Sequence, residues 1–260
     1  MPAVVAGAAA LVTLLGATGW AVGQTDRTAP EALTALPGVG LDAPPLVEVA
    51  PEAAADPAPT GPPSVAASDV PAVDDGWVRR VAAATGIPPV AMLAYGRAAL
   101  RLRSAQPGCR LGWPTLAGIG AVESDHGRHG GGGLDGAGRT TIPILGPALD
   151  GSEGLAAIPS TADSQRWHGD PLWDHAVGPM QFIPSTWTRW GSDGNGDGVA
   201  DPTNINDAAW TAARYLCASG ADLSTTAWGD AILTYNEDAD YVRAVHAHAS
   251  TYAALARSAG

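Results

Sequence analysis

One carboxylic acid in this chain has surroundings suited to proton transfer. Glu123 follows an apolar run, Leu116–Val122, and precedes a polar, glycine-rich stretch, Ser124–Gly130. We expect it at a helix C-terminus, where the helix dipole and partial desolvation both raise the pKa of a carboxyl group. Half-protonation at pH 6 needs a pKa shift of about 1.7 units, or about 2.3 kcal/mol. Such an acid could protonate the leaving oxygen of a glycosidic bond, although an isolated glutamate there is more often a solvated helix end.

Two downstream segments carry polar side chains that could serve the same site. The first, Gly178–Trp187, sets Gln181 among apolar residues and continues to a helix start at which Ser185 is the expected N-cap. The second places an aromatic hydroxyl beside an amide, in Tyr235 and Asn236, at the expected end of a helix. Each has a purely structural alternative. Gln181 could be a core amide that satisfies backbone groups, and Tyr235-Asn236 could be a helix C-cap with Asn in the left-handed turn.

Between these segments lies a loop rich in Asp, Asn and Gly that resembles an EF-hand calcium loop. Oxygen ligands recur at the spacing of that motif, with glycine at position six (Asp193, Asn195, Asp197, the Val199 backbone, Asp201 and Asn204). Position twelve is Asn204 rather than a bidentate Glu, so we expect weakened affinity. Bound Ca²⁺ would be structural, and no cofactor is expected for the chemistry. A metal-free array of Asx turns is the alternative.

Three histidines raise the question of a zinc site. His126 and His129 stand three apart in a glycine-rich loop, and His168 follows later in the chain. Without cysteine partners this spacing is weak grounds for zinc, and we expect solvated loop histidines.

The elements that position these residues are expected to be helices. Apolar spacing, prolines in first turns and glycine stops predict six of them (Trp77–Thr85, Pro88–Ser104, Pro114–Glu123, Asp207–Ser219 with Gly220 as C-cap, Thr226–Tyr235 and Asp238–Ala256). No long stretch alternates as a strand would, so the domain is predicted to be mainly α. The connection Ser124–His175 is long enough to be either a substrate-groove wall or a floppy insertion.

Composition limits the partners. The chain of 260 residues has 26 acidic against 14 basic side chains, a formal net charge of -12, and no lysine. Nucleic acid or an anionic membrane surface would be repelled by this balance. The folded domain, expected at 76–260, is long enough to form a single core and is expected to be a monomer.

The N-terminal part of the chain indicates export. Residues 1–23 are mostly apolar and read as a cleaved signal peptide or a retained membrane anchor, although no Lys or Arg precedes them. Residues 24–75 are rich in Ala, Pro and acidic residues, and we expect a disordered linker. Cys109 and Cys217 are expected to form a disulfide in an exported chain, with two buried free thiols as the alternative. The predicted location is the cell envelope or the exterior, by secretion or membrane anchoring.

Taken together, the motifs resemble a known family. Glu123-Ser124, the Gly178–Ser185 segment and Tyr235-Asn236, in this order and spacing, are similar to lytic murein transglycosylases of bacterial cell walls, closest to the membrane-bound type B. The resemblance spans roughly Cys109 to the C-terminus. It implies a goose-lysozyme-like α domain whose partner is the glycan strand of peptidoglycan.

The same resemblance implies a reaction. The β-1,4 bond between N-acetylmuramic acid and N-acetylglucosamine would be cleaved without water, leaving a 1,6-anhydromuramoyl end, with Glu123 as acid and then base. Gln181 and Asn236 would bind the sugar's polar groups, Tyr235 would orient Glu123 or the sugar, and Ser124 would help hold the site. One departure stands out, because Glu237 and Asp238 follow where relatives carry small neutral residues. A second carboxylate in the groove would favour a hydrolytic muramidase, and a non-catalytic peptidoglycan-binding module is the further alternative.

Overall fold

The computed structural model describes residues 36, 38 and 70–259, and their fold is mainly helical. Eight α-helices are found among the described residues (α1 Asp75–Thr85, α2 Pro89–Ala105, α3 Trp113–Ser124, α4 Ala162–His168, α5 Pro184–Trp190, α6 Ile205–Leu216, α7 Ala227–Tyr235 and α8 Ala239–Ala259). In the same residues, β-structure is limited to isolated bridges such as Val177 with Phe182. The mainly α prediction is therefore confirmed.

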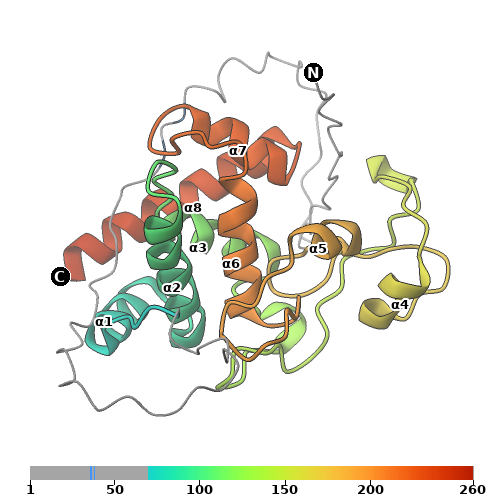
Figure 1. Ribbon diagram of the computed structural model, residues 1–260, viewed down its shortest axis with the longest axis horizontal. Helices are drawn as coiled ribbons and strands as arrows, with labels where there is room; N and C mark the ends of the chain where they lie inside the picture. Colours follow the sequence, from blue (N-terminus) through green and yellow to red (C-terminus); the bar gives the residue numbers. More distant parts are fainter. Residues whose placement is uncertain (1–35, 37, 39–69, 260) are drawn as a thin grey trace, which may run out of the picture.

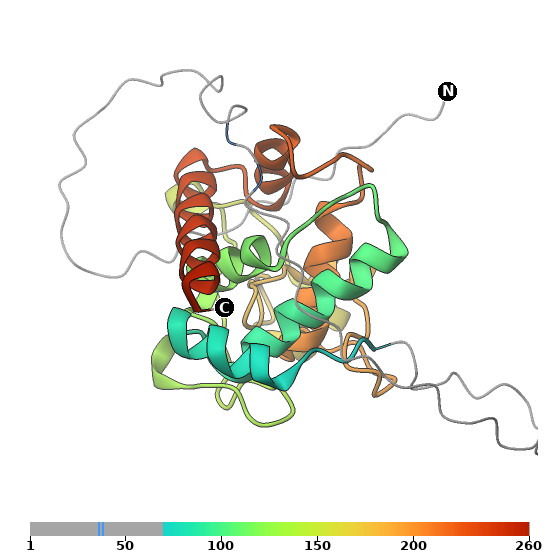
Figure 2. The ribbon, with the colours of Figure 1, turned by 90° about the vertical axis from the view of Figure 1, so that its left-hand side faces the viewer.

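The helix α3 lies at the centre of the core, between α2 and α8 (Figure 1). Ten of its residues are buried, so it is apolar on all sides, as expected of a helix surrounded by others. Gly118 lets α8 approach closely, since a Cβ there would lie 2.7 Å from the carbonyl oxygen of Val245. The helices α2 and α6 lie side by side on the other side of the core, which Figures 1 and 2 both show.

A disulfide joins the C-terminal ends of α2 and α6. Cys109 follows α2, Cys217 is the C-cap of α6, and the two are bonded across a sequence separation of 108 residues. This confirms the expected pairing. In the chain-entropy model, closing a loop of this length stabilises the fold by about 4–5 kcal/mol.

The helix boundaries differ from the predicted ones in places. The C-cap of α6 is Cys217 rather than Gly220, and the N-cap of α5 is Ile183 rather than Ser185, because Pro184 takes the first helical position. The helix α4 was not predicted, since its seven residues are too few to show a period.

The long connection after α3, Ser124–His175, is folded, and it is called the arm below. It contains α4 at the edge of the molecule in Figure 1 and a small apolar cluster around Leu149, Ala176 and Ile183. Bridges pair Asp150 with Ala157 and Pro159 with Trp173. The connection is thus an ordered arm rather than a floppy insertion.

The predicted domain boundaries, 1–23, 24–75 and 76–260, stay predictions, because residues 1–35 and 39–69 lie outside the described ones. Parts of the expected linker contact the domain: Leu36 packs against the core, the backbone N–H of Gly38 donates to the carbonyl of Thr225 at 3.3 Å, and Val73 is buried in the core. Within the described part of the chain, no helix has both the length and the apolar character needed to cross a membrane.

Candidate active site

Glu123 lies one residue before the end of α3 and is buried. Its exposed fraction is 3%, and burial raises the pKa of its carboxyl group to about 8. Among the described residues, burial is opposed by a hydrogen bond of 2.6 Å that the Tyr241 hydroxyl donates to Oε1 of Glu123, which lowers the pKa. At neutral pH the group therefore holds its proton and can act as a general acid. Glu123 is not a solvated helix end.

Tyr241 is a site residue that sequence reasoning missed. It stands in the first turn of α8, and its buried ring stacks on Tyr235 with centroids 6.4 Å apart and planes 7° apart. An available signal was its position just after Tyr235-Asn236, because a short link between α7 and α8 keeps the two tyrosines in one corner.

Ser124 and Tyr235 hold one short backbone segment from two sides. The hydroxyl of Ser124 donates to the carbonyl of Pro179 at 2.6 Å, and the hydroxyl of Tyr235 donates to the carbonyl of Met180 at 2.7 Å. The Ser124 oxygen also accepts from the backbone N–H of Gly127 at 2.8 Å. The structure thus brings the end of α3, the end of α7 and the segment before α5 together at Glu123.

Gln181 is buried beside this segment, and its backbone has a left-handed φ of 47°. Its amide nitrogen donates to the carbonyl of Gly178 at 2.8 Å and to that of Ile144 at 3.4 Å. These bonds to the backbone are those of a core amide, which was the alternative reading from the sequence. The substrate contact expected of Gln181 stays a prediction.

Asn236 is the C-cap of α7 and is buried next to Tyr235. Its Oδ1 accepts from the backbone N–H of Asp238 at 3.0 Å, which leads the chain into α8. The structural alternative is right about the C-cap and wrong about the left-handed turn, because Asn236 is extended with a φ of -148°. Its role toward a sugar also stays a prediction.

Glu237 is exposed and does not contribute to the raised pKa of Glu123. Among the described residues, no other carboxylate shifts that pKa. The site therefore has one buried acid rather than a coupled pair.

His126 links two other helices just after α3. One ring nitrogen is 3.1 Å from the Tyr95 hydroxyl of α2, and the other is 3.0 Å from the Tyr252 hydroxyl of α8. Burial lowers the pKa of His126 to about 4, so the ring is neutral and can accept from one tyrosine while donating to the other. The expectation of a solvated histidine is wrong here, and it is met only by the exposed His129.

The remaining predicted histidine, His168, belongs to the arm. Its ring is buried and lies 3.3 Å from Asp174, while the neighbouring His175 lies 3.1 Å from Asp170. These contacts join the end of α4 to the segment that follows it, and a solvated state is wrong for His168 too.

The predicted calcium loop lies apart from Glu123, between α5 and α6. Both oxygens of Asp193 accept from backbone N–H groups, at 2.6 Å from Gly196 and 2.7 Å from Gly198. The guanidinium of Arg139 binds the carboxylates of Asp201 at 2.7 Å and Asp197 at 3.4 Å.

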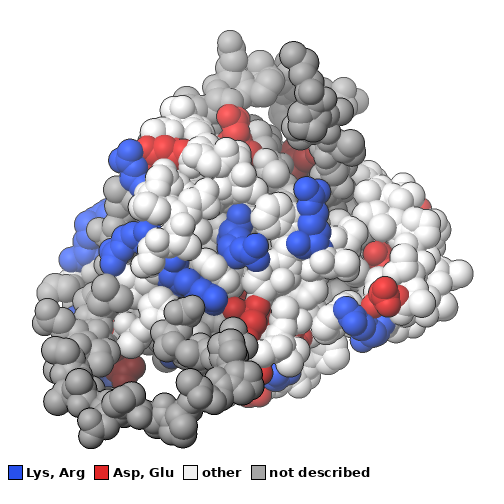
Figure 3. Space-filling view, in the orientation of Figure 1, with Lys and Arg blue, Asp and Glu red and all other residues white. Residues whose placement is uncertain are grey.

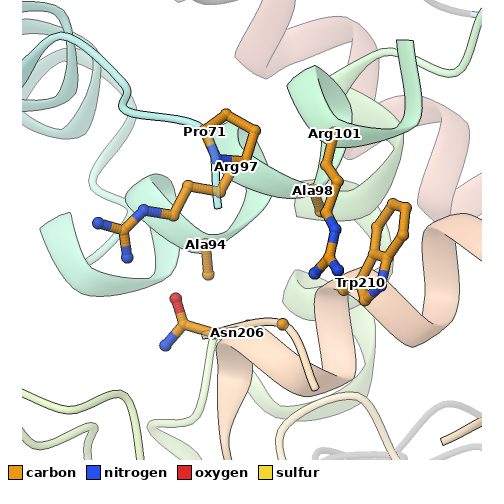
Figure 4. A pocket seen from close by; sticks show the side chains of 8 residues that line it. Pro71, Ala94, Arg97, Ala98, Arg101, Asn206 and Trp210 are labelled. Atoms are coloured by element: carbon orange, nitrogen blue, oxygen red, sulfur yellow. The ribbon is translucent and has the colours of Figure 1, made fainter. Parts of the chain in front are cut away.

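Other residues anchor this loop to the domain. Asn204 is the N-cap of α6, and buried Asp207 accepts from the backbone of Gly194 at 2.8 Å and of Asp201 at 3.0 Å. On the α2 side, Arg101 donates to the carbonyl of Asp193 at 2.9 Å and covers the ring of Trp210, beside a small hollow (Figure 4).

A metal fits this loop poorly in the described arrangement. Within the described residues, no group of three or more His, Cys, Asp and Glu side chains is placed to hold a metal ion. Arg139 instead neutralises two of the predicted ligands, and Asn204 caps α6. Asn195 is half-buried and Val199 is exposed in the same loop. The calcium site stays a prediction.

Residues 161–256 match the family model of the transglycosylase SLT domain. This match confirms the resemblance to lytic transglycosylases of the lysozyme-like superfamily, and it includes Gln181, Tyr235 and Asn236. It begins after Glu123, so it does not test the role of that residue. No curated protein and no solved structure matches the chain. The SLT match supports a transglycosylase-type enzyme with peptidoglycan as its substrate.

Proposed function

We propose that this protein is a lytic murein transglycosylase that cleaves the bond between N-acetylmuramic acid and N-acetylglucosamine and forms 1,6-anhydromuramoyl ends. The observation that carries the proposal is the burial of Glu123, which raises the pKa of its carboxyl group to about 8 beside the Tyr241 hydroxyl. A single acid of this kind suits a reaction in which one residue gives a proton and takes another back.

In the first step, the protonated Glu123 gives its proton to the glycosidic oxygen as the bond from that oxygen to C1 of the muramoyl sugar breaks. The acetamido group of the same sugar would stabilise the positive charge on C1. Glu123 is then a buried carboxylate, which is costly in a dry site. The hydrogen bond from Tyr241 to Oε1 offsets part of that cost, because it favours the charged form.

In the second step, the O6 hydroxyl of the muramoyl sugar attacks C1, and Glu123 accepts its proton. The products are an anhydro end and a free 4-hydroxyl on the other sugar, and Glu123 is protonated again. No water is consumed. Burial, and not a neighbouring carboxylate among the described residues, raises the pKa of Glu123, which suits a route that uses a single acid.

The other residues of the site would hold the backbone and the sugar in place beside Glu123. Ser124 and Tyr235 fix the backbone at Pro179 and Met180, which sets Gln181 and the entry to α5 beside Glu123. We propose that Gln181 and Asn236 contact the sugar once it binds, and that an N-terminal segment places the enzyme in the cell envelope.

Mass spectrometry of digested peptidoglycan tests the proposal. A transglycosylase releases muropeptides with anhydro ends, which are lighter by one water than the reducing ends that a muramidase releases. The Glu123→Gln variant should lose nearly all turnover but still bind glycan strands. A protein that binds glycan without turnover in both forms would instead be a binding module.

A further inference from the structure

A band of aromatic rings leads from the buried acid to the surface. Tyr241, bonded to Glu123, stacks on Tyr235. Tyr235 meets the ring of Tyr215 edge-on at 6.0 Å between centroids, and Tyr215 meets the ring of Trp190 at 5.6 Å. The first two rings are buried and the last two are partly exposed. The candidate site is thus continuous with a surface at the ends of α5, α6 and α7.

Two arginines flank the exposed end of this band. The guanidinium carbons of Arg189 and Arg214 lie 5.8 Å and 6.0 Å from the centroid of the Trp190 ring. Arg214 donates to the Trp190 carbonyl and the Ser192 hydroxyl, which are both neutral. Within the described residues, neither arginine forms an ion pair, and both are exposed.

The surface around Arg189 and Arg214 is also positively charged. Figure 3 shows arginines gathered over α2, α5 and α6, with few acidic groups between them, although the chain as a whole is acidic. Burial raises the pKa of Tyr215; the positive charge of Arg189 lowers it, and the negative charge of Glu237 raises it, so both charges act at this end of the band. A local positive surface therefore persists in a chain that would otherwise repel anions.

The chemistry of this surface fits a carboxylate-bearing peptide. A guanidinium binds a carboxylate through two parallel hydrogen bonds, and Trp and Tyr rings offer flat contact area at low entropic cost. The glycan substrate proposed above carries acidic stem peptides on its muramoyl sugars, so a strand held at Glu123 would bring a stem to its flank.

We propose that Trp190, Tyr215, Arg189 and Arg214 form a subsite that binds the acidic stem peptide of the glycan strand. This inference rests on the proposed function. The subsite would make the enzyme prefer strands that carry stems over strands from which an amidase has removed them.

The first test compares these two substrates. Arg189→Gln should lower kcat/KM about tenfold on stem-bearing strands, the loss of about 1.4 kcal/mol of binding, and leave kcat/KM on stripped strands unchanged. Arg79→Gln, an exposed arginine on α1, is the matched control and should change neither value. An equal loss on both substrates, or no loss on either, overturns the subsite.

A second test does not depend on turnover. Binding of a purified stem tetrapeptide, followed by calorimetry, should be weaker for Arg189→Gln than for the unsubstituted protein and weaken with salt. Identical binding, or binding of a phosphate-rich wall polymer and not of the tetrapeptide, would overturn the inference. If neither glycan is cleaved but tetrapeptide binding follows Arg189, the proposed reaction fails and the subsite stands.

Discussion

The hydroxyl of Tyr241 lies 2.6 Å from Oε1 of Glu123 and joins the first turn of α8 to the last turn of α3. Burial and this hydrogen bond oppose each other at the carboxyl group. Burial dominates and raises the pKa to about 8, while the hydrogen bond lowers it. Burial thus keeps Glu123 protonated at neutral pH, while the hydrogen bond from Tyr241 stabilises the carboxylate that forms when Glu123 gives up its proton.

Replacement of Tyr241 by Phe should therefore move the pKa of Glu123 further upward. The measurement is the pH dependence of kcat/KM on glycan strands, whose alkaline limb should shift to higher pH. The maximal rate should fall about tenfold or more, since the carboxylate formed in the first step loses a hydrogen bond of about 1.5–3 kcal/mol. Tyr235→Phe is the control for the position of the limb only: its hydroxyl contacts Met180 and not Glu123, so the alkaline limb should stay in place even if the rate falls. An alkaline limb that moves to lower pH in Tyr241→Phe, or does not move, would contradict this account.

Glu123 should also make the folded state sensitive to alkali. Its pKa is about 8 in the folded protein and near 4.5 when unfolded, so the folded state binds more protons between these values. Stability contributed at this site is present below about pH 4.5 and is lost as pH rises toward 8.

Glu123→Gln removes this dependence, and the side chain can still accept from Tyr241. The variant should match the unsubstituted protein in Tm near pH 4 and exceed it by a widening margin up to about pH 8. Thermal unfolding across this range checks it. A variant less stable at pH 8 than the unsubstituted protein would mean that Glu123 is charged in the fold.

Much of the fold followed from local sequence signals. Prolines in first turns marked α2 and α3, and apolar spacing marked α6 and α8, because these patterns act within a few residues. The acid and the disulfide were also predictable, since each depends on composition and a short context. The helix α4 is too short to show a clear period. The helix and the bridges of the arm depend on long-range contacts, which no local pattern indicates.

The candidate site was predictable as a set of motifs but not as a geometry. Ser124 and Tyr235 do meet one segment beside Glu123, but their contacts run through the backbone carbonyls of Pro179 and Met180. Every residue has a backbone carbonyl, so contacts to carbonyls cannot be predicted from the residue types. Tyr241 and His126 were missed as buried partners for a related reason, because their role comes from helices far away in the sequence.

His126 should stabilise the end of α3 by bonding to Tyr95 and Tyr252. His126→Gln should cost about 1–3 kcal/mol in the free energy of unfolding, because it leaves a buried hydroxyl unpaired. The pKa of His126 is about 4 when folded, lowered by burial and by Arg128 and His248 against the opposite effect of Asp125. Its contribution is therefore full above about pH 6.5 and is lost as pH falls toward 4.

Denaturant unfolding at pH 7 and pH 4.5 measures this difference. The destabilisation by His126→Gln should shrink at the lower pH. His129→Gln, at an exposed position three residues on, is the control and should have no effect beyond about 0.5 kcal/mol. A cost that is the same at both pH values would show that His126 is not a neutral bridge.

Calcium, if it binds the Asp193–Asn204 loop, must compete with Arg139 for Asp197 and Asp201. Because Arg139 already neutralises them, millimolar calcium should raise the Tm only slightly in the unsubstituted protein, and Arg139→Gln should enlarge the rise because it frees both carboxylates. Asp193→Asn should reduce it. A calorimetric titration without heat, together with an unchanged Tm in all three proteins, would remove calcium from this loop.

Gly178 should be irreplaceable, because it lies where two segments of backbone meet. Its φ is 82°, and a Cβ there would lie 1.9 Å from the carbonyl oxygen of Pro202. Gly169 has a similar φ of 77°, but a Cβ there would meet nothing within 4 Å. Substitution of these two glycines therefore distinguishes the cost of backbone strain from the cost of a steric collision.

Gly169→Ala should cost about 1 kcal/mol from the left-handed conformation alone. Gly178→Ala should cost that amount and a further ~2 kcal/mol or more, since backbone must move to admit the methyl group. The movement would displace Pro179 and Met180 from Ser124 and Tyr235, so glycan turnover should fall with stability in this variant only. Denaturant unfolding and turnover of glycan strands measure the two effects. Equal costs for both substitutions, with turnover unchanged, would show that the carbonyl contacts do not hold the site.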